Sequence, residues 1–365
     1  MIIGKKFLAV LVAICLVLAA GSYAVYRMTI SRGAQKSEIN FTECAPALYL
    51  MPHHMAEKMK FYGDSDIILN KAAISQGAEA LRALEQGDLD MALVMVEDYI
   101  YHLSRKQPGA SNLMAVAALT SGSASFLLAG EASPNFKWED LKGKVVISGS
   151  RETLENVMLE QILTKRKLTP NMDLNIYYNI PDELKVGAIR AKTGDYLVLR
   201  EPQASRAADK GLVVVASLDS DIGRIPSVVL VVEKNMLAQR PGIVQSVVNS
   251  MYQGQIWLKY HSDTEIANNL PAAFKEQDQK QLAKSIKVFV DGKVWGEDIV
   301  PGEEHFQQTV ALFNKSREIP REVKSQEALD CSFATTALST VNYIPEDKKP
   351  KRAFPYSVID YFFGS

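Results

Sequence analysis

Two stretches of the chain share one pattern of apolar and polar positions. The first stretch, 78–96, has a helical spacing of apolar residues, then the pair Gly87-Asp88, then an unbroken apolar run at 91–96. The second stretch, 186–199, repeats this order, with Gly194-Asp195 before its apolar run. A short apolar run that follows a turn is typical of a buried strand. The repeated order therefore predicts two similar α/β lobes that face one another.

Polar residues follow both of these predicted strands. Glu97 and Tyr99 come after the first apolar run, and Arg200 and Glu201 come after the second. Open α/β sheets bind their ligands at the carboxyl ends of strands. We therefore expect these four residues at a ligand site.

Two joints between later apolar runs predict where the chain passes from one lobe to the other. The segments 120–123 and 220–226 link runs rich in strand-forming residues and lack a helical pattern. Such joints are expected to be crossover strands. We expect the following parts: lobe 1 from 38–121 and 226–333, lobe 2 from 122–225, and a C-terminal extension at 334–365.

The first 30 residues are expected to lie outside the two lobes. An uncharged, largely apolar run at 7–26 lies between Lys5-Lys6 and Arg27. Its length suits a hydrocarbon core of about 30 Å. A cleaved signal peptide and a retained membrane anchor are both compatible with it. Either one predicts an extracytoplasmic protein, in the periplasm or on the outer face of the cytoplasmic membrane.

Composition narrows the classes of partner and cofactor. The 41 basic and 42 acidic residues give a net charge of −1, which argues against nucleic acid. Outside the apolar run the cysteines are Cys44 and Cys331, without metal-type spacing, and their pairing stays open. His53 and His54 are interpreted as surface or packed imidazoles, because adjacent residues point to different sides of a helix. We predict no metal site and no cofactor.

One turn has the composition of an anion site. Gly149, Ser150, Arg151 and Thr153 lie between an apolar run and a helix that starts at Leu154. Free backbone N–H groups and hydroxyls at a helix N-terminus bind anions, although plain N-capping explains the same residues equally well. Further contacts are expected at other turns. The full set of predicted ligand contacts is Cys44, Ala45, Ser75, Gln76, Glu97, Tyr99, Thr120, Ser121, Gly149, Ser150, Arg151, Thr153, Arg200 and Glu201.

The order and spacing of several segments resemble one class of transport protein. The chain is similar to the extracytoplasmic substrate-binding proteins of ABC importers for nitrate, alkanesulfonates, taurine and thiamine-pyrimidine precursors, which have the type II periplasmic-binding-protein fold. The resemblance spans about 41–333. It departs from the class at Arg200, where an aromatic residue is usual, and at 97–99, where a Pro-containing loop is usual. The matching segments are 77–94, 140–146, 149–150, 200–207 and 240–258.

This resemblance implies a monomer that captures a small, anionic organic solute between its lobes by hinge closure, without chemistry. Its partners would be an ABC permease and an ATPase, with the N-terminal segment at the membrane. Arg200 would suit an anionic group, or would pair with Glu201 or Glu97 instead. Two alternatives stay open: an enzyme of pyrimidine or menaquinone precursor synthesis on the same fold, and a membrane-anchored ligand sensor.

Overall fold

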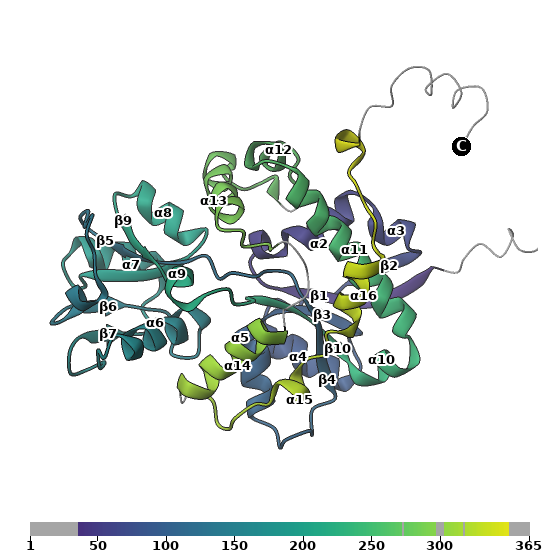
Figure 1. Ribbon diagram of the computed structural model, residues 1–365, viewed down its shortest axis with the longest axis horizontal. Coiled ribbons are helices and arrows are strands. Elements are labelled where there is room, and N and C mark those ends of the chain that lie inside the picture. The colour runs from purple at the N-terminus through teal and green to yellow at the C-terminus, as the bar shows by residue number, and fades with distance from the viewer. Residues whose placement is uncertain (1–35, 272–273, 297–302, 317, 350–365) are drawn as a thin grey trace, which may run out of the picture.

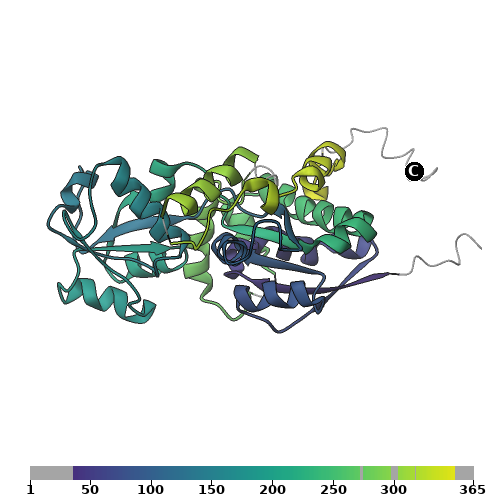
Figure 2. The same cartoon turned by 90° about the horizontal axis from the view of Figure 1, so that it is seen from below.

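The computed structural model describes residues 36–271, 274–296, 303–316 and 318–349. These residues form two lobes that lie side by side (Figures 1 and 2). Each lobe is built on a five-stranded mixed sheet covered by helices. The predicted α/β class is therefore confirmed.

Lobe 1 contains the sheet of order β2-β1-β3-β10-β4. Its first three strands are parallel, and β10 runs antiparallel to both of its neighbours. β3 and β10 are almost entirely buried, as expected for strands covered on both faces. The strands are β1 (Ser37–Cys44), β2 (Ile67–Lys71), β3 (Met91–Met95), β4 (Leu113–Ala118) and β10 (Val228–Glu233).

Lobe 2 repeats this design with the order β7-β6-β8-β5-β9. Three parallel strands are again followed by an antiparallel strand, here β5. The strands are β5 (Ser125–Ala129), β6 (Val145–Ile147), β7 (Asn175–Tyr177), β8 (Tyr196–Arg200) and β9 (Val213–Ser217).

The helices pack on both sheets. Those that follow the lobe 1 strands are η1 (Ala47–Leu50), α2 (Met51–Lys58), α3 (Phe61–Asp64), α4 (Gly77–Gln86), α5 (Val96–Ser104), α10 (Lys234–Gln239), α11 (Pro241–Tyr260), α12 (Asp263–Asn268), α13 (Gln279–Asp291), α14 (Glu303–Ser316), α15 (Ser325–Ala328), α16 (Ser332–Thr340) and η4 (Glu346–Lys348). Those of lobe 2 are η2 (Trp138–Leu141), α6 (Leu154–Lys165), α7 (Asp182–Arg190), α8 (Gln203–Asp209) and α9 (Leu218–Ile222).

The two Gly-Asp pairs have different structural roles. Gly87 adopts φ +80° after α4, and the N–H groups of Gly87 and Asp88 bond back to Leu84 and Ala83, which ends the helix as a Schellman motif. Gly194 instead allows a close approach, because a Cβ there would lie 2.8 Å from the Cδ1 atom of Ile147. The two Gly-Asp pairs therefore need glycine for different reasons, although their sequences are the same.

The two segments that cross between the sheets are hydrogen-bonded to each other. The Thr120 hydroxyl oxygen accepts from the backbone N–H groups of Ser227 (2.8 Å) and Val228 (3.2 Å). The Ser227 hydroxyl donates to the Gly122 carbonyl at 3.0 Å. The second joint was expected to lack helix, but it begins with α9, whose Asp219 carboxylate accepts from the backbone and hydroxyl of Ser123. This carboxylate fixes α9 against the other crossover.

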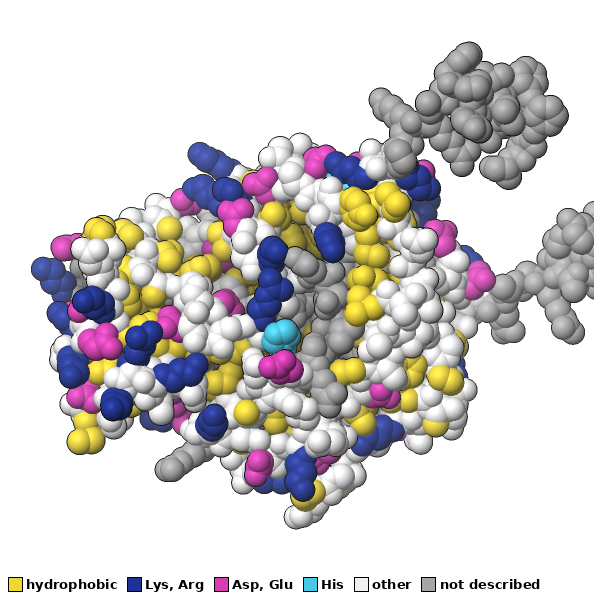
Figure 3. Space-filling model, viewed as in Figure 1, with side chains coloured by type: hydrophobic (Ala, Val, Ile, Leu, Met, Phe, Trp, Pro, Cys, Tyr) yellow, Lys and Arg dark blue, Asp and Glu magenta, His cyan; other side chains and the backbone are white. Residues whose placement is uncertain are grey.

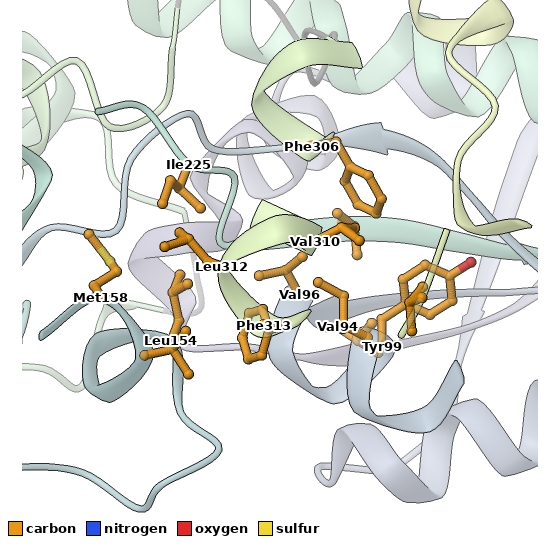
Figure 4. Packing of buried hydrophobic residues seen from close by; sticks show 14 of the residues in the cluster. Val94, Val96, Tyr99, Leu154, Met158, Ile225, Phe306, Val310, Leu312 and Phe313 are labelled. Atoms are coloured by element: carbon orange, nitrogen blue, oxygen red, sulfur yellow. The ribbon is translucent and has the colours of Figure 1, made fainter. Parts of the chain in front are cut away.

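Helix α14 connects the lobes by apolar packing. Phe306, Val310 and Phe313 are buried in the same cluster as Leu154 and Met158 of α6 (Figure 4). The cluster also includes Val94 and Tyr99 from lobe 1. A helix that follows lobe 1 in the sequence thus buries its apolar side partly against lobe 2.

The cysteines, the N-terminal apolar run and the surface charge were also subjects of sequence predictions. Cys44 and Cys331 are not joined by a disulfide. The apolar run 7–26 lies outside the described residues, and no helix within the described ranges has the length and apolarity to cross a membrane. Lys and Arg side chains are interspersed with Asp and Glu side chains on the face in Figure 3, in keeping with the near-zero net charge.

Candidate ligand cleft between the lobes

A cavity of about 550 Å³ lies between the two lobes. Lobe 1 contributes Pro46, from the turn after β1, and Met95, the last residue of β3. The carboxyl ends of strands from both lobes therefore meet at this cavity, as expected for a ligand site in such sheets. Lobe 2 contributes Gly149, Ser150, Thr153, Glu155, Asn179, Ile180, Pro181, Asp182, Lys185, Val198, Leu199, Arg200 and Gln203.

An ion-pair cluster lies at the wall of this cavity. Arg200, the last residue of β8, donates from Nη2 to Glu97 Oε1 at 2.9 Å. The same guanidinium binds the carboxylate of Glu155. Glu97 lies in the first turn of α5 and Glu155 in the first turn of α6, where the helix dipole favours negative charge. One partly buried cation thus holds a carboxylate from each lobe.

Burial and ion pairing both shift the pKa values of this cluster. It raises the pKa of Glu97, and the neighbouring Glu155 adds to this effect while Arg200 opposes it. Burial alone would lower the pKa of Arg200, but the carboxylates of Glu155 and Glu97 raise it well above its usual range. The guanidinium is therefore always charged. Glu97 Oε2 is buried and has no hydrogen-bond partner among the described residues.

The turn at 149–153, which was predicted to bind an anion, does line the cavity. The carboxylate of Glu155, however, already occupies part of the space beside this turn. A Cβ at Gly149 would lie 2.7 Å from Glu155 Oε1 and 2.6 Å from Thr153 Oγ1. The Ser150 hydroxyl donates to Asn179 Oδ1 at 2.8 Å, and the Thr153 hydroxyl donates to the Ser150 carbonyl at 2.9 Å. The groups expected to receive an anion are thus arranged around Glu155.

The predicted contacts fall into three groups. Gly149, Ser150, Thr153 and Arg200 line the cleft, and Glu97 joins them through Arg200. Ser121 and Glu201 line a second cavity of about 560 Å³ beside the crossovers, near Thr120. The remaining residues, which the structure does not bring to the cleft, are Cys44, Ala45, Ser75, Gln76, Tyr99 and Arg151.

Packing explains why Tyr99 and Arg151 turn away from the cleft. Tyr99 follows the first turn of α5, is fully buried in the core, and donates its hydroxyl to the Ala328 carbonyl at 2.8 Å. The Arg151 guanidinium lies over the ring of Tyr178 at 4.2 Å and pairs with Glu318. The strand-end prediction failed for Tyr99 because β3 ends at Met95 and a helix begins at once.

Other predicted contacts have local roles. The Cys44 thiol donates to the Ile74 carbonyl at 3.2 Å, and burial raises its pKa to about 11. Glu201 is buried and accepts from the hydroxyls of Ser205 (2.7 Å) and Ser285 (2.9 Å). Neither residue contributes to the wall of the interlobe cavity.

Sequence reasoning missed three charged residues of the cleft, Glu155, Asp182 and Lys185. Glu155 carried a signal, since an acidic residue in the first turn of a helix lies next to any anion turn that precedes it. Lys185, on α7, is buried and pairs with Asp182 at 2.6 Å. None of the described residues that line this cavity is His or Cys.

Comparison with proteins of known sequence gives a match over most of the chain. The NMT1-like family matches residues 39–272. YtlA of Bacillus subtilis (strain 168), a candidate binding protein, is 24% identical over 304 residues, which cover 83% of this chain and 90% of YtlA.

Solved structures share the fold at low sequence identity. The periplasmic sulfonate-binding protein SsuA of Methylobacillus flagellatus KT has a TM-score of 0.66 and 15% identity, over 84% of this chain and 94% of SsuA. The periplasmic nitrate-binding protein NrtA of Synechocystis PCC 6803 has a TM-score of 0.60 and 13% identity, over 86% and 91% of the two chains. The desulfurization enzyme DSZB also shares it, with a TM-score of 0.60 and 12% identity over 83% and 99%. The two-lobe architecture is thus that of periplasmic binding proteins, and the family match shows that this chain belongs to the NMT1-like family.

Proposed function

We propose that this protein is the extracytoplasmic solute-binding component of an ABC importer and captures a small organic acid between its lobes. The observation that carries the proposal is the interlobe cavity of about 550 Å³ with the cluster of Arg200, Glu97 and Glu155 at its wall. A volume of this order suits a small solute. The fold shared with SsuA and NrtA, which bind sulfonate and nitrate, supports this reading.

The mechanism is closure of the lobes around the solute. The crossovers absorb the rotation, and contacts from both lobes stabilise the closed form. Arg200 is suited to this role because its guanidinium contacts a carboxylate from each lobe. A ligand bound at Arg200 would bias the position of lobe 2 relative to Glu97.

The charges at the cleft favour a solute that carries both an acid and an amine. A sulfonate or carboxylate group would bind to Arg200 and the N-terminus of α6, and would displace the Glu155 carboxylate. An ammonium group would then donate to the displaced Glu155 or to the unpartnered Oε2 of Glu97. Taurine has both groups at the required small size.

The proposal extends to partners and location. A solute-binding component of this kind delivers its ligand to a permease driven by an ATPase. We propose that the protein works as a monomer outside the cytoplasm, with the apolar run 7–26 as its export signal or membrane anchor.

A thermal-shift series on the full-length chain tests the ligand class. Taurine carries both groups, ethanesulfonate carries only the acid, and ethanolamine carries only the amine; nitrate, amino acids, pyrimidines and aromatic acids complete the panel. A ligand at a hundred times its dissociation constant adds about 2.7 kcal/mol of stability. We expect taurine to stabilise the protein more than ethanesulfonate, and ethanolamine to have no effect. A panel without any stabilising compound would contradict the proposed solute class.

A pair of glycine variants tests whether the thermal shift arises from binding in the cleft. Gly149→Ala places a methyl group against Thr153 and Glu155 and should abolish the shift. Gly187→Ala, whose Cβ would meet nothing within 4 Å, is the matched control and should retain it. Consumption of the bound compound would favour an enzyme on this fold, as in DSZB, over a binding protein.

A further inference from the structure

A second cluster of polar side chains lies in lobe 1, away from the cleft. Glu43, near the end of β1, meets His53, His54 and Glu57 of α2, and one ligand atom of each lies within 4.8 Å of the others. Both histidines are buried and both glutamates are half-buried. A cavity of about 790 Å³ opens onto Glu43, His54 and Glu57. No described residue lines both this cavity and the interlobe cleft.

The spacing between the donor atoms suits a four-coordinate ion. His53 Nε2 lies 3.1 Å from Glu43 Oε1 and 3.3 Å from Glu57 Oε2. His54 Nε2 lies 3.7 Å from Glu43 Oε2. Ligands of a tetrahedral zinc ion, with bonds of about 2.0–2.2 Å, are about 3.4 Å apart. These three distances therefore lie within a few tenths of an ångström of tetrahedral spacing, and the whole set of four ligand atoms lies within 4.8 Å.

A strand residue explains how two adjacent histidines serve one site. His53 and Glu57 lie four residues apart, on the same face of α2. His54 points about 100° away around the helix, but Glu43 enters from β1 and approaches both imidazoles. The interpretation of His53 and His54 as surface or packed imidazoles overlooked Glu57, four residues after His53, and had no means to place Glu43.

Outer contacts hold the histidines in the orientation of metal ligands. The Nδ1 atom of His53 lies 2.7 Å from the hydroxyl of the buried Tyr62. With Nδ1–H donating to this oxygen, the lone pair of Nε2 faces the two carboxylates, as in most histidine ligands of metals. The Nε2 atom of His54, a residue only 4% exposed, has no hydrogen-bond partner among the described residues. A buried nitrogen without a hydrogen-bond partner, 3.7 Å from a carboxylate oxygen, has its lone pair available to a metal ion.

The ammonium group of Lys71 shows where this cluster already binds a positive charge. The Lys71 ammonium contacts the carboxylates of both Glu57, at 2.7 Å, and Glu43. Its side chain is 41% exposed and can swing into solvent. The two carboxylates therefore already pair with one cation that can move aside.

We propose that Glu43, His53, His54 and Glu57 form a site for a zinc-type divalent ion, with Lys71 as the displaceable cation. Two imidazoles and two carboxylates are a donor set for zinc, whereas magnesium and calcium require oxygen ligands. The ion would tie β1 to α2 directly before the turn whose Pro46 lines the cleft. It therefore stabilises the lobe 1 wall of the ligand site and takes no part in chemistry.

Zinc titration of the full-length chain by calorimetry tests the site. We expect one zinc ion per chain, with affinity at least tenfold weaker in His53→Gln and in Glu57→Gln. His102→Gln is the matched control, because His102 also lies beside a carboxylate, with Nε2 3.2 Å from Glu85 Oε1. Its affinity for zinc should equal that of the parent. Equal affinity of all four proteins would overturn the proposal.

Lys71→Met separates a metal site from a simple ion-pair cluster. Removing the competing ammonium should strengthen zinc binding several-fold and make the melting temperature rise more steeply with zinc than in the parent. A Lys71→Met protein that binds zinc no more tightly than the parent would contradict the displacement. Cobalt in the parent should give the visible absorption of a four-coordinate ion, lost in His54→Gln at unchanged far-ultraviolet circular dichroism; a six-coordinate spectrum would contradict the geometry.

Discussion

Arg200 of lobe 2 and Glu97 of lobe 1 form an ion pair of 2.9 Å across the cleft. The exposed fractions of their side chains are 16% and 10%. A largely buried pair with a member on each lobe makes the stability of the molecule and the relative position of the lobes depend on the same contact.

Arg200→Ala should be strongly destabilising. It leaves the buried carboxylates of Glu97 and Glu155 without a cation, which costs about 3–5 kcal/mol. Urea denaturation measures this loss. Arg166→Ala is the control, since Arg166 pairs with Asp221 at the same 2.9 Å but is 45% exposed, and such pairs contribute about 1 kcal/mol or less. Equal losses in the two variants would contradict the importance assigned to burial.

Tyr99→Phe should affect stability without affecting solute binding. It removes a buried hydrogen bond to the Ala328 carbonyl, for a loss of about 1 kcal/mol in the free energy of unfolding. Calorimetric titration with the solute should give the parent's affinity. A marked loss of affinity would return Tyr99 to the ligand site, where the sequence placed it.

Asp98→Asn should remove a pH dependence of stability. Burial raises the pKa of Asp98 to about 6, the Glu97 carboxylate adds to this, and Arg200 opposes it. Since the native state holds this proton more tightly than the unfolded chain, the parent's free energy of unfolding falls as pH rises from about 4 to about 6 and then levels off. Denaturation curves at several pH values should show the variant more stable than the parent near neutral pH and similar near pH 4. A constant difference would contradict the shift.

Phe313→Ala should loosen α14 from α6. Phe313 is 1% exposed within the cluster that spans both lobes, and truncation of such a residue costs about 3–5 kcal/mol. Hydrogen exchange should become faster in α6 as well as in α14. Leu338→Ala, at a position 38% exposed on α16, is the control and should leave exchange in α6 unchanged. Unchanged exchange of α6 in Phe313→Ala would show that the helices are not coupled.

Local patterns in the sequence were enough to predict strands of both sheets. The runs 91–96 and 196–199 became β3 and β8, because unbroken apolar segments after a turn have few alternatives to a buried strand. The carboxyl ends of the strands then placed Arg200 correctly at the cleft. The same rule misplaced Tyr99, since it gives no information on where a helix begins.

The sequence alone did not predict contacts between distant segments. The pairing of Arg200 with Glu97 was one of several options, and its choice depends on how the lobes meet. The packing of α14 on α6 joins segments about 150 residues apart, and no local periodicity encodes such a contact. One part of the cluster at His53 was predictable, because Glu57 lies four residues later on the same helix. The approach of Glu43 from β1 was not, because it depends on how the strand packs against the helix.

The measurement that tests the central claim most directly is hydrogen exchange of the full-length chain with and without taurine. Closure of the lobes on a solute predicts slower exchange on both sides of the cleft, at 149–157 of lobe 2 and at 96–100 of lobe 1, together with the crossover at 119–124. Slower exchange confined to one lobe, or no change in either, would contradict capture of the solute between the lobes.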